Sequence, residues 1–145
     1  MTYDIDPPNM DGITPADQRT AFKVGQLFYA VLDLHYLTRS SDKTVLHWCG
    51  QVPLYPALAL ARVASAAVDA LPRLRDQTVR ERYSQRIDEL LQEIGVTYLT
   101  CERLSDKSRM AFWLGYSAER NWYRLRAKVK NQADAPAKPM GMALA

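Results

Sequence analysis

The fold is decided by residues 14–39, which read TPADQRTAFKVGQLFYAVLDLHYLTR. Thr14 can cap a helix, and Pro15 has no amide to lose in a first turn. Apolar side chains then recur at helical spacing, with Val24, Phe28 and Val31 on one stripe. Others spread around most of the circumference: Leu27, Tyr29, Leu32, Leu34 and Tyr36. We therefore predict a central helix, from residue 15 to about residue 39, that is covered on several sides.

Three more helices are predicted after this one, at about residues 54–71, 78–94 and 105–130. The first of them is alanine-rich, with Leu54, Leu58 and Val68 on one stripe. The second begins with Thr78-Val79-Arg80-Glu81, which is a capping-box pattern, and Gly95 is its predicted stop. The third begins with a serine that can cap it.

The chain of 145 residues has the size of one domain. Residues 40–56 contain Ser-Ser-Asp, Gly50 and two prolines, so they are predicted to be a long connection that packs across the bundle. The expected fold class is all-α, a four-to-five-helix bundle over residues 15–130 with this long loop after the first helix. The acidic residues 1–14 and the tail 131–145 are expected to be flexible.

The apolar pattern and the cysteine usage predict a cytoplasmic protein without a membrane partner. No apolar stretch approaches the roughly 20 residues that cross a bilayer. The first twelve residues, MTYDIDPPNMDG, contain no apolar signal region. Two thiols without an export signal, Cys49 and Cys101, are expected to be reduced and buried.

The last predicted helix has two apolar faces. At 100° per residue, the predicted core-facing stripe contains Met110, Leu114, Ala118, Asn121, Trp122, Leu125 and Val129. The second strip contains Phe112, Tyr116 and Tyr123 and is flanked by Arg120 and Arg124. Because Trp, Tyr and Arg lead interface hot spots, we predict that Phe112, Tyr116 and Tyr123 form a partner interface. The alternative is that the long connection covers this strip and that water solvates the arginines.

Positive charge is concentrated in the same helix, although the formal net charge of the whole chain is only +3. Residues 103–130 hold eight bases against Asp106 and Glu119, a net charge of +6 on one segment. Such a cluster raises the local potential and favours a polyanionic partner. For any single arginine, the alternative is a solvated helix position. The predicted nucleic-acid-binding residues are Arg62, Arg80, Arg82, Arg120, Arg124, Arg126 and Lys128.

Motifs that would indicate catalysis are missing from the sequence. It contains no Gly-rich phosphate loop, no HExxH, no CxxC and no GxSxG. His47 and Cys49 lie two residues apart and form the start of an alternative metal site. The further ligands would be His35 or Cys101, but the close ligand pairs of zinc modules are absent. We therefore expect no enzyme activity, cofactor, metal or small-molecule substrate.

Three stretches of the sequence are distinctive in their order. In and just before the last helix stand Leu104-Ser105, residues 112–116 (FWLGY) and Glu119-Arg120. In the first helix stand residues 21–32 (AFKVGQLFYAVL), and the middle of the chain contributes Gly50, Pro56, Ala57 and Arg62. Together they resemble the C-terminal helical region of the large subunit of subtype I-C CRISPR surveillance complexes (Cascade). That region is also made separately as the small subunit of the complex.

This resemblance covers about residues 20–124 and implies a non-catalytic subunit, present in several copies beside the backbone that carries the guide RNA. It implies as partners the backbone and large subunits, copies of the chain itself, DNA and guide RNA. Its role would be to stabilise the R-loop through sequence-independent phosphate contacts. The competing hypothesis is a helical protein–protein adaptor or dimerisation module with no nucleic-acid role. In that case Phe112, Tyr116 and Tyr123 are the whole functional surface.

Overall fold

A computed structural model describes residues 16–39, 43–99 and 103–134 of the chain. Within these ranges the chain forms α-helices and one short 3₁₀ helix, and no strand. The elements are α1 (Ala16–Leu37), α2 (Lys43–Gln51), α3 (Pro56–Ala70), η1 (Leu71–Arg73), α4 (Gln77–Leu99) and α5 (Asp106–Asp134). The predicted all-α bundle is confirmed.

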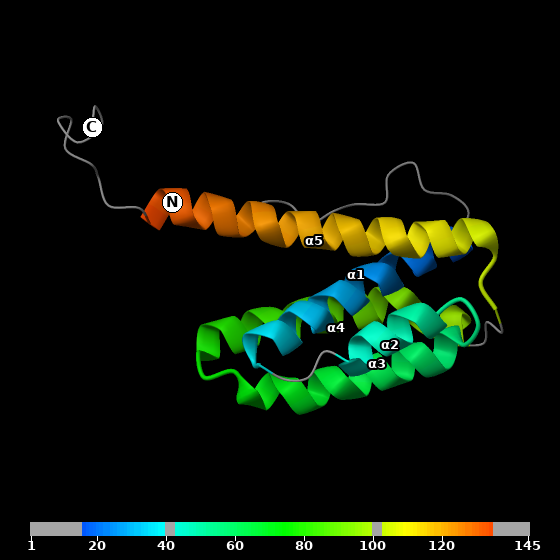
Figure 1. Cartoon of the computed structure of the whole chain (residues 1–145), viewed down its shortest axis with the longest axis horizontal. Coiled ribbons are helices and arrows are strands. Elements are labelled where there is room, and N and C mark those ends of the chain that lie inside the picture. Colours follow the sequence, from blue (N-terminus) through cyan, green and yellow to red (C-terminus); the bar gives the residue numbers. More distant parts are fainter. Residues whose placement is uncertain (1–15, 40–42, 100–102, 135–145) are drawn as a thin grey trace.

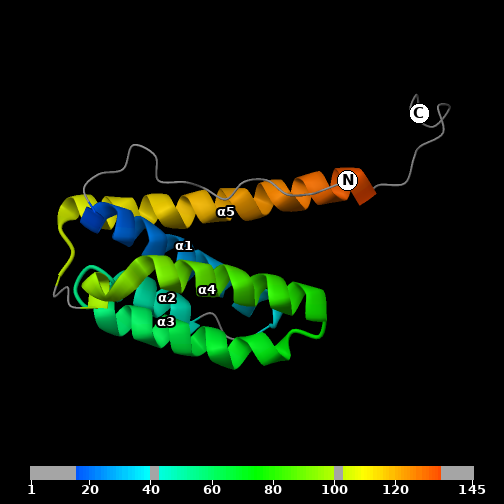
Figure 2. The same ribbon diagram turned by 180° about the vertical axis from the view of Figure 1, so that it is seen from behind.

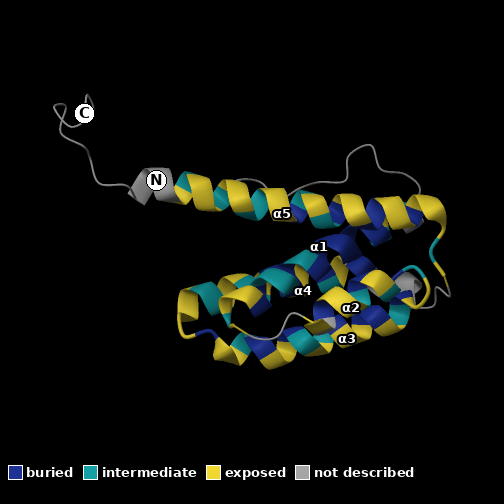
Figure 3. Cartoon of the chain, in the orientation of Figure 1, coloured by how far each residue is buried: buried dark blue, intermediate teal, exposed yellow. Residues whose placement is uncertain are grey.

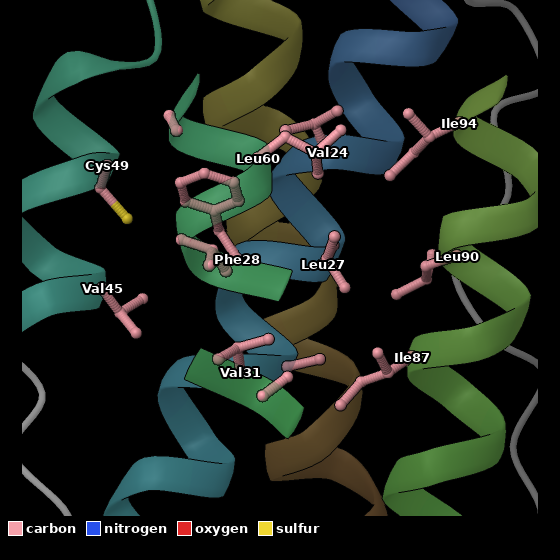
Figure 4. Packing of buried hydrophobic residues seen from close by; sticks show 14 of the residues in the cluster. Val24, Leu27, Phe28, Val31, Val45, Cys49, Leu60, Ile87, Leu90 and Ile94 are labelled. Carbon is pink, nitrogen blue, oxygen red and sulfur yellow. The ribbon is translucent and has the colours of Figure 1, made fainter. Parts of the chain in front are cut away.

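Helix α1 lies at the centre of the bundle, as its sequence predicts. It contacts each of the other α-helices. Helix α5 lies along one side of α1, and α2 and α3 lie on the opposite side (Figures 1 and 2). Figure 4 shows Leu27 and Phe28 of α1 between Val45 of α2 and Leu90 of α4. All four side chains are fully buried. Because each large apolar side chain contributes about 1.5–3 kcal/mol when it is buried, α1 organises the core.

Two glycines allow α1 and α5 to pack backbone against backbone. A Cβ atom added to Gly25 of α1 would lie 1.9 Å from the carbonyl oxygen of Phe112. A Cβ atom added to Gly115 of α5 would lie 1.9 Å from the carbonyl oxygen of Phe22. No side chain fits at such distances. The glycines of two of the distinctive sequence stretches therefore have a packing role at this helix crossing.

The long loop predicted over residues 40–56 is wrong for its central part, which forms helix α2. Val45 and Cys49 of this helix are buried, and α2 packs against α1 and α3. A helix of nine residues is too short to show a clear apolar period, and Gly50 falls in its last turn. Pro56 belongs to the first turn of α3, where a proline is well tolerated. The predicted packing across the bundle is confirmed.

Helix α3 buries a different face from the one its large apolar residues suggest. The predicted stripe of Leu54, Leu58 and Val68 is exposed. The buried face consists mainly of small residues: Pro56, Ala59, Leu60, Val63, Ala67 and Ala70. Small side chains let α3 approach its neighbours closely. The buried face of α3 is therefore the one that permits close packing and not the one with the largest apolar side chains.

Helix α4 begins at a different cap from the predicted one and continues past its predicted stop. The Oδ1 atom of Asp76 accepts hydrogen bonds from the backbone N–H groups of Thr78, at 2.9 Å, and Val79, at 3.3 Å. Asp76 therefore caps the helix in place of Thr78. The helix runs through Gly95 to Leu99, so the predicted stop at Gly95 is wrong.

Helix α5 begins as predicted, because the Oγ atom of Ser105 accepts a hydrogen bond from the backbone N–H of Ser108 at 3.2 Å. It continues to Asp134, four residues into the predicted tail. The predictions for residues 1–14, for the rest of that tail and for Cys101 fall outside the described residues. Among the helices described, none combines the length and the apolar character that a membrane span requires.

Candidate nucleic-acid interface

The structure reverses the two faces that the sequence predicts for α5. The ring of Phe112 is buried and meets that of Phe28 edge-on, with 5.2 Å between centroids. Tyr116 and Tyr123 both pack against Tyr29 of α1, at 5.2 and 5.5 Å. The predicted partner interface is therefore wrong for Phe112, which is buried in the chain's own core. Tyr116 and Tyr123 are half-buried and pack against that core, so much of each ring is already used within the chain.

The predicted core stripe of α5 lies largely at the surface. Met110 is 67% exposed, Leu114 is 58% exposed and Leu125 is 48% exposed. Asn121 is also exposed, whereas Ala118, Trp122 and Val129 are half-buried. The physical reason is the glycine crossing, because only the side of α5 that carries Gly115 can touch the backbone of α1.

The exposed side of α5 is the outer face, and Figure 3 shows yellow patches that recur along this helix. It contains Lys107, Met110, Trp113, Leu114, Ser117, Arg120, Asn121, Arg124, Leu125 and Lys128. Apolar side chains gather towards the N-terminal half, and cations follow at Arg120, Arg124 and Lys128. Among the described residues, these three cations form no ion pair, so their charge is available to a partner.

The predicted nucleic-acid-binding residues fall into separate groups. Arg120, Arg124 and Lys128 lie on the outer face, and Arg126 stacks over the Trp122 ring at 4.7 Å. Arg82 of α4 joins Arg124 and Arg126 at the wall of one cavity. Arg62 lies on α3, on the side of the molecule away from α5 (Figure 1). Arg80 is half-buried, and its Nε atom has no hydrogen-bond partner among the described residues.

A buried ion pair that the sequence did not reveal stands behind this surface. The Nε and Nη2 atoms of Arg86 donate to the carboxylate of Glu119 at 2.8 and 2.7 Å. Gln26 of α1 donates to the same carboxylate at 3.3 Å. At 100° per residue, Glu119 falls only about 20° from Phe112 around the helix. An acid on the same strip as these aromatic residues is the one sequence signal that indicates a buried ion pair. Arg86 is therefore a core residue and not a solvated one.

The cavity lined by Arg82, Arg124 and Arg126 has a volume of about 530 Å³ and lies between α1, α4 and α5. Its walls include Tyr29, Tyr36, Tyr83 and Tyr123. The hydroxyl of Tyr83 donates a hydrogen bond to Asp33, which also lines the cavity. Burial raises the pKa of Asp33, although the hydrogen bond from Tyr83 acts in the opposite direction. Sequence reasoning missed this cavity, because its walls come from three helices.

Of the alternative metal site, His35, His47 and Cys49 are described, and they do not come together as a set of ligands. His47 is exposed and its ring meets that of Trp48, whereas Nε2 of His35 lies 3.3 Å from the carbonyl oxygen of Ala66. Burial raises the pKa of the Cys49 thiol to about 12, which disfavours the thiolate that metals bind. In the part of the chain that is described, no group of three or more His, Cys, Asp or Glu residues could hold a metal ion.

No protein-family model, curated protein or solved structure matches the chain. The function therefore has to be inferred from the residues and from the surfaces they form.

Proposed function

We propose that this chain is a non-catalytic small subunit of a CRISPR RNA-guided surveillance complex (Cascade). In this role the chain binds nucleic-acid phosphates through the outer face of α5 and stabilises the R-loop. The observation that carries the proposal is the row of Arg120, Arg124 and Lys128, which are exposed and unpaired among the described residues. The resemblance of three sequence stretches to that family supports it.

The spacing of these cations suits a sequence-independent contact. Arg120, Arg124 and Lys128 recur every four residues, which places them about 6 Å apart along the helix axis. Arginine offers forked donors to phosphate oxygens, and lysine adds a point charge. Phosphate contacts carry no base information, so such a row binds any strand that follows it.

The apolar part of the outer face suits the second requirement, which is packing on neighbouring subunits. Met110, Trp113 and Leu114 are exposed together near the N-terminal half of α5. Aromatic residues and Met are enriched at protein interfaces. We assign this half of the outer face to the backbone and large subunits or to copies of the chain, and the cationic half to nucleic acid.

The test is to measure single-stranded DNA binding against salt concentration for the wild-type chain and for Arg120→Ala plus Arg124→Ala. Loss of two phosphate contacts should reduce the steepness of the log–log slope by about 1.4. The matched control is Arg73→Ala plus Arg75→Ala, which removes the same charge from exposed positions in and after η1, away from α5. The nucleic-acid role is overturned if the slope of the wild type is flat, or if both double variants bind like the wild type.

The alternative function is a helical protein–protein adaptor without a nucleic-acid role, and the exposure of Met110, Trp113 and Leu114 favours it. An apolar interface survives raised ionic strength, whereas phosphate contacts weaken steeply. The two functions can be distinguished by purifying the chain together with the products of neighbouring genes and analysing what is bound to it. A bound RNA of uniform length supports the Cascade subunit, and a salt-resistant protein complex free of nucleic acid supports the adaptor.

A further inference from the structure

The cavity between α1, α4 and α5 combines aromatic walls with a cationic edge. Tyr29, Tyr36, Tyr83 and Tyr123 line it, and its volume of about 530 Å³ lies within the usual range of small-ligand sites. Tyr36 is 79% exposed, and its side chain forms no ring contact or hydrogen bond with the residues described. It therefore presents a free aromatic face at the mouth of the cavity.

The charged groups of the cavity favour an anion. Arg82, Arg124 and Lys130 are exposed lining residues that form no ion pair within the described ranges. The other two cations are engaged, because Arg86 is held by Glu119 and Arg126 stacks on a tryptophan ring. Among the described lining residues, Asp33 carries the single carboxyl, which accepts the hydrogen bond of Tyr83. Three free cations therefore face one acid that already has a partner.

We propose that this cavity binds one nucleotide, with its base against the tyrosine rings and its phosphate on Arg82, Arg124 and Lys130. Inorganic phosphate alone leaves the aromatic walls unused, and an uncharged apolar ligand leaves the cations unused. Bases stack on aromatic side chains without regard to sequence, and arginine adds forked donors to phosphate. A nucleotide is the ligand that uses both halves of the site.

The nucleotide is either free or part of a strand, and the geometry connects the cavity to a strand. Arg124 belongs both to the outer face of α5 and to the wall of the cavity. A single strand that follows Arg120 and Arg124 therefore reaches the mouth of the cavity, where an unstacked base can enter. This form of the inference rests on the proposed function, whereas binding of a free nucleotide does not.

The experiment compares two single-stranded oligonucleotides with equal numbers of phosphates. One is oligo(dT) with a central 2-aminopurine, and the other is the same backbone with abasic sites throughout. We expect the base-containing strand to bind more tightly and its 2-aminopurine fluorescence to be quenched on binding. The variant Tyr36→Ala should weaken binding of that strand on the order of tenfold and leave the abasic strand unaffected.

The matched control is Tyr55→Ala, because Tyr55 is 56% exposed, precedes α3 and does not line the cavity. Both variants are at the surface, so both should fold. Competition by AMP distinguishes a free nucleotide from a nucleotide that is part of a strand. Displacement of the strand by AMP indicates that a free nucleotide also fits the cavity. No displacement indicates that the cavity takes a base only from a strand.

Equal binding of the abasic and base-containing strands, together with no binding of AMP, overturns nucleotide binding in the cavity and leaves the proposed phosphate contacts standing. Equal affinity of the wild type and Tyr36→Ala for the base-containing strand also overturns nucleotide binding in the cavity. If neither strand binds but AMP does, the cavity stands and the proposed function falls. If neither strand nor AMP binds, both are overturned.

Discussion

Arg86 of α4 and Glu119 of α5 are joined by two hydrogen bonds, of 2.8 and 2.7 Å, in the interior of the molecule. Glu119 is 0% exposed, and Gln26 of α1 also donates to it. Burial lowers the pKa of Arg86, but the hydrogen bond and the charge of Glu119 raise it, and the net direction is upwards. One carboxylate thus ties three helices together, and Arg86 keeps its charge.

Glu119→Ala should be strongly destabilising because it leaves Arg86 buried without its partner. The free energy of unfolding should fall by about 3–5 kcal/mol, as measured by urea denaturation. Glu89→Ala is the control, since Glu89 also pairs with Arg86 but is half-exposed and 3.7 Å away, and should cost about 0–1 kcal/mol. Similar losses for the two variants would contradict the role of the buried pair.

Gly25→Ala and Gly115→Ala should each separate α1 from α5, because the new Cβ atom meets a backbone carbonyl that cannot move aside. We expect a loss of more than about 3 kcal/mol, the upper range for an overpacked core. Gly50→Ala is the matched control, because a Cβ atom there has nothing within 4 Å. Alanine is the better helix former, so this control should raise stability by about 0.5–1 kcal/mol. Equal effects at Gly25 and Gly50 would contradict the close crossing.

The order and approximate position of most helices follow from the sequence. The stretch that contains Val24, Phe28 and Val31 is apolar on nearly all sides, and such a helix has to be covered on several sides. The cap at Ser105 is predictable because capping is a local interaction between a side chain and the backbone that follows it. The cap at Asp76 is not predictable in the same way, since Thr78 two residues later offers an equally good local cap pattern.

The choice of the buried face of α5 was not available from periodicity. Both faces carry large apolar side chains, so the apolar stripe through Met110 and Leu114 matched a core pattern as well as the strip through Phe112. Two long-range facts decide between them. Gly115 must meet the backbone of α1, and Glu119 must meet Arg86. The tyrosine-lined cavity was equally hidden, because no single segment contains its walls.

Cys49 should react slowly with thiol reagents while the chain is folded. Burial raises its pKa from 9.0 to about 12, so at pH 8 the thiolate is about a thousandfold scarcer than in the unfolded chain. Its contribution to stability is fully present below about pH 9 and is lost as the pH rises towards 12.

The measurement is the rate of modification by DTNB in a Cys101→Ser background, in which Cys49 is the single cysteine. The rate should be at least about a hundredfold lower than in urea and should rise with pH above 9. A native rate within tenfold of the unfolded rate would show that the thiol is not buried.

The reversed faces of α5 predict opposite outcomes for two neighbouring alanine substitutions. Phe112 is 1% exposed, so Phe112→Ala should lower the free energy of unfolding by about 3–5 kcal/mol. Leu114 is 58% exposed, so Leu114→Ala should change it by no more than about 0.5 kcal/mol. If the periodicity of the sequence had identified the core correctly, Leu114→Ala would be the damaging change. Because Leu114→Ala leaves the fold intact, any loss of co-purifying subunits in this variant assigns the outer face directly to a protein partner.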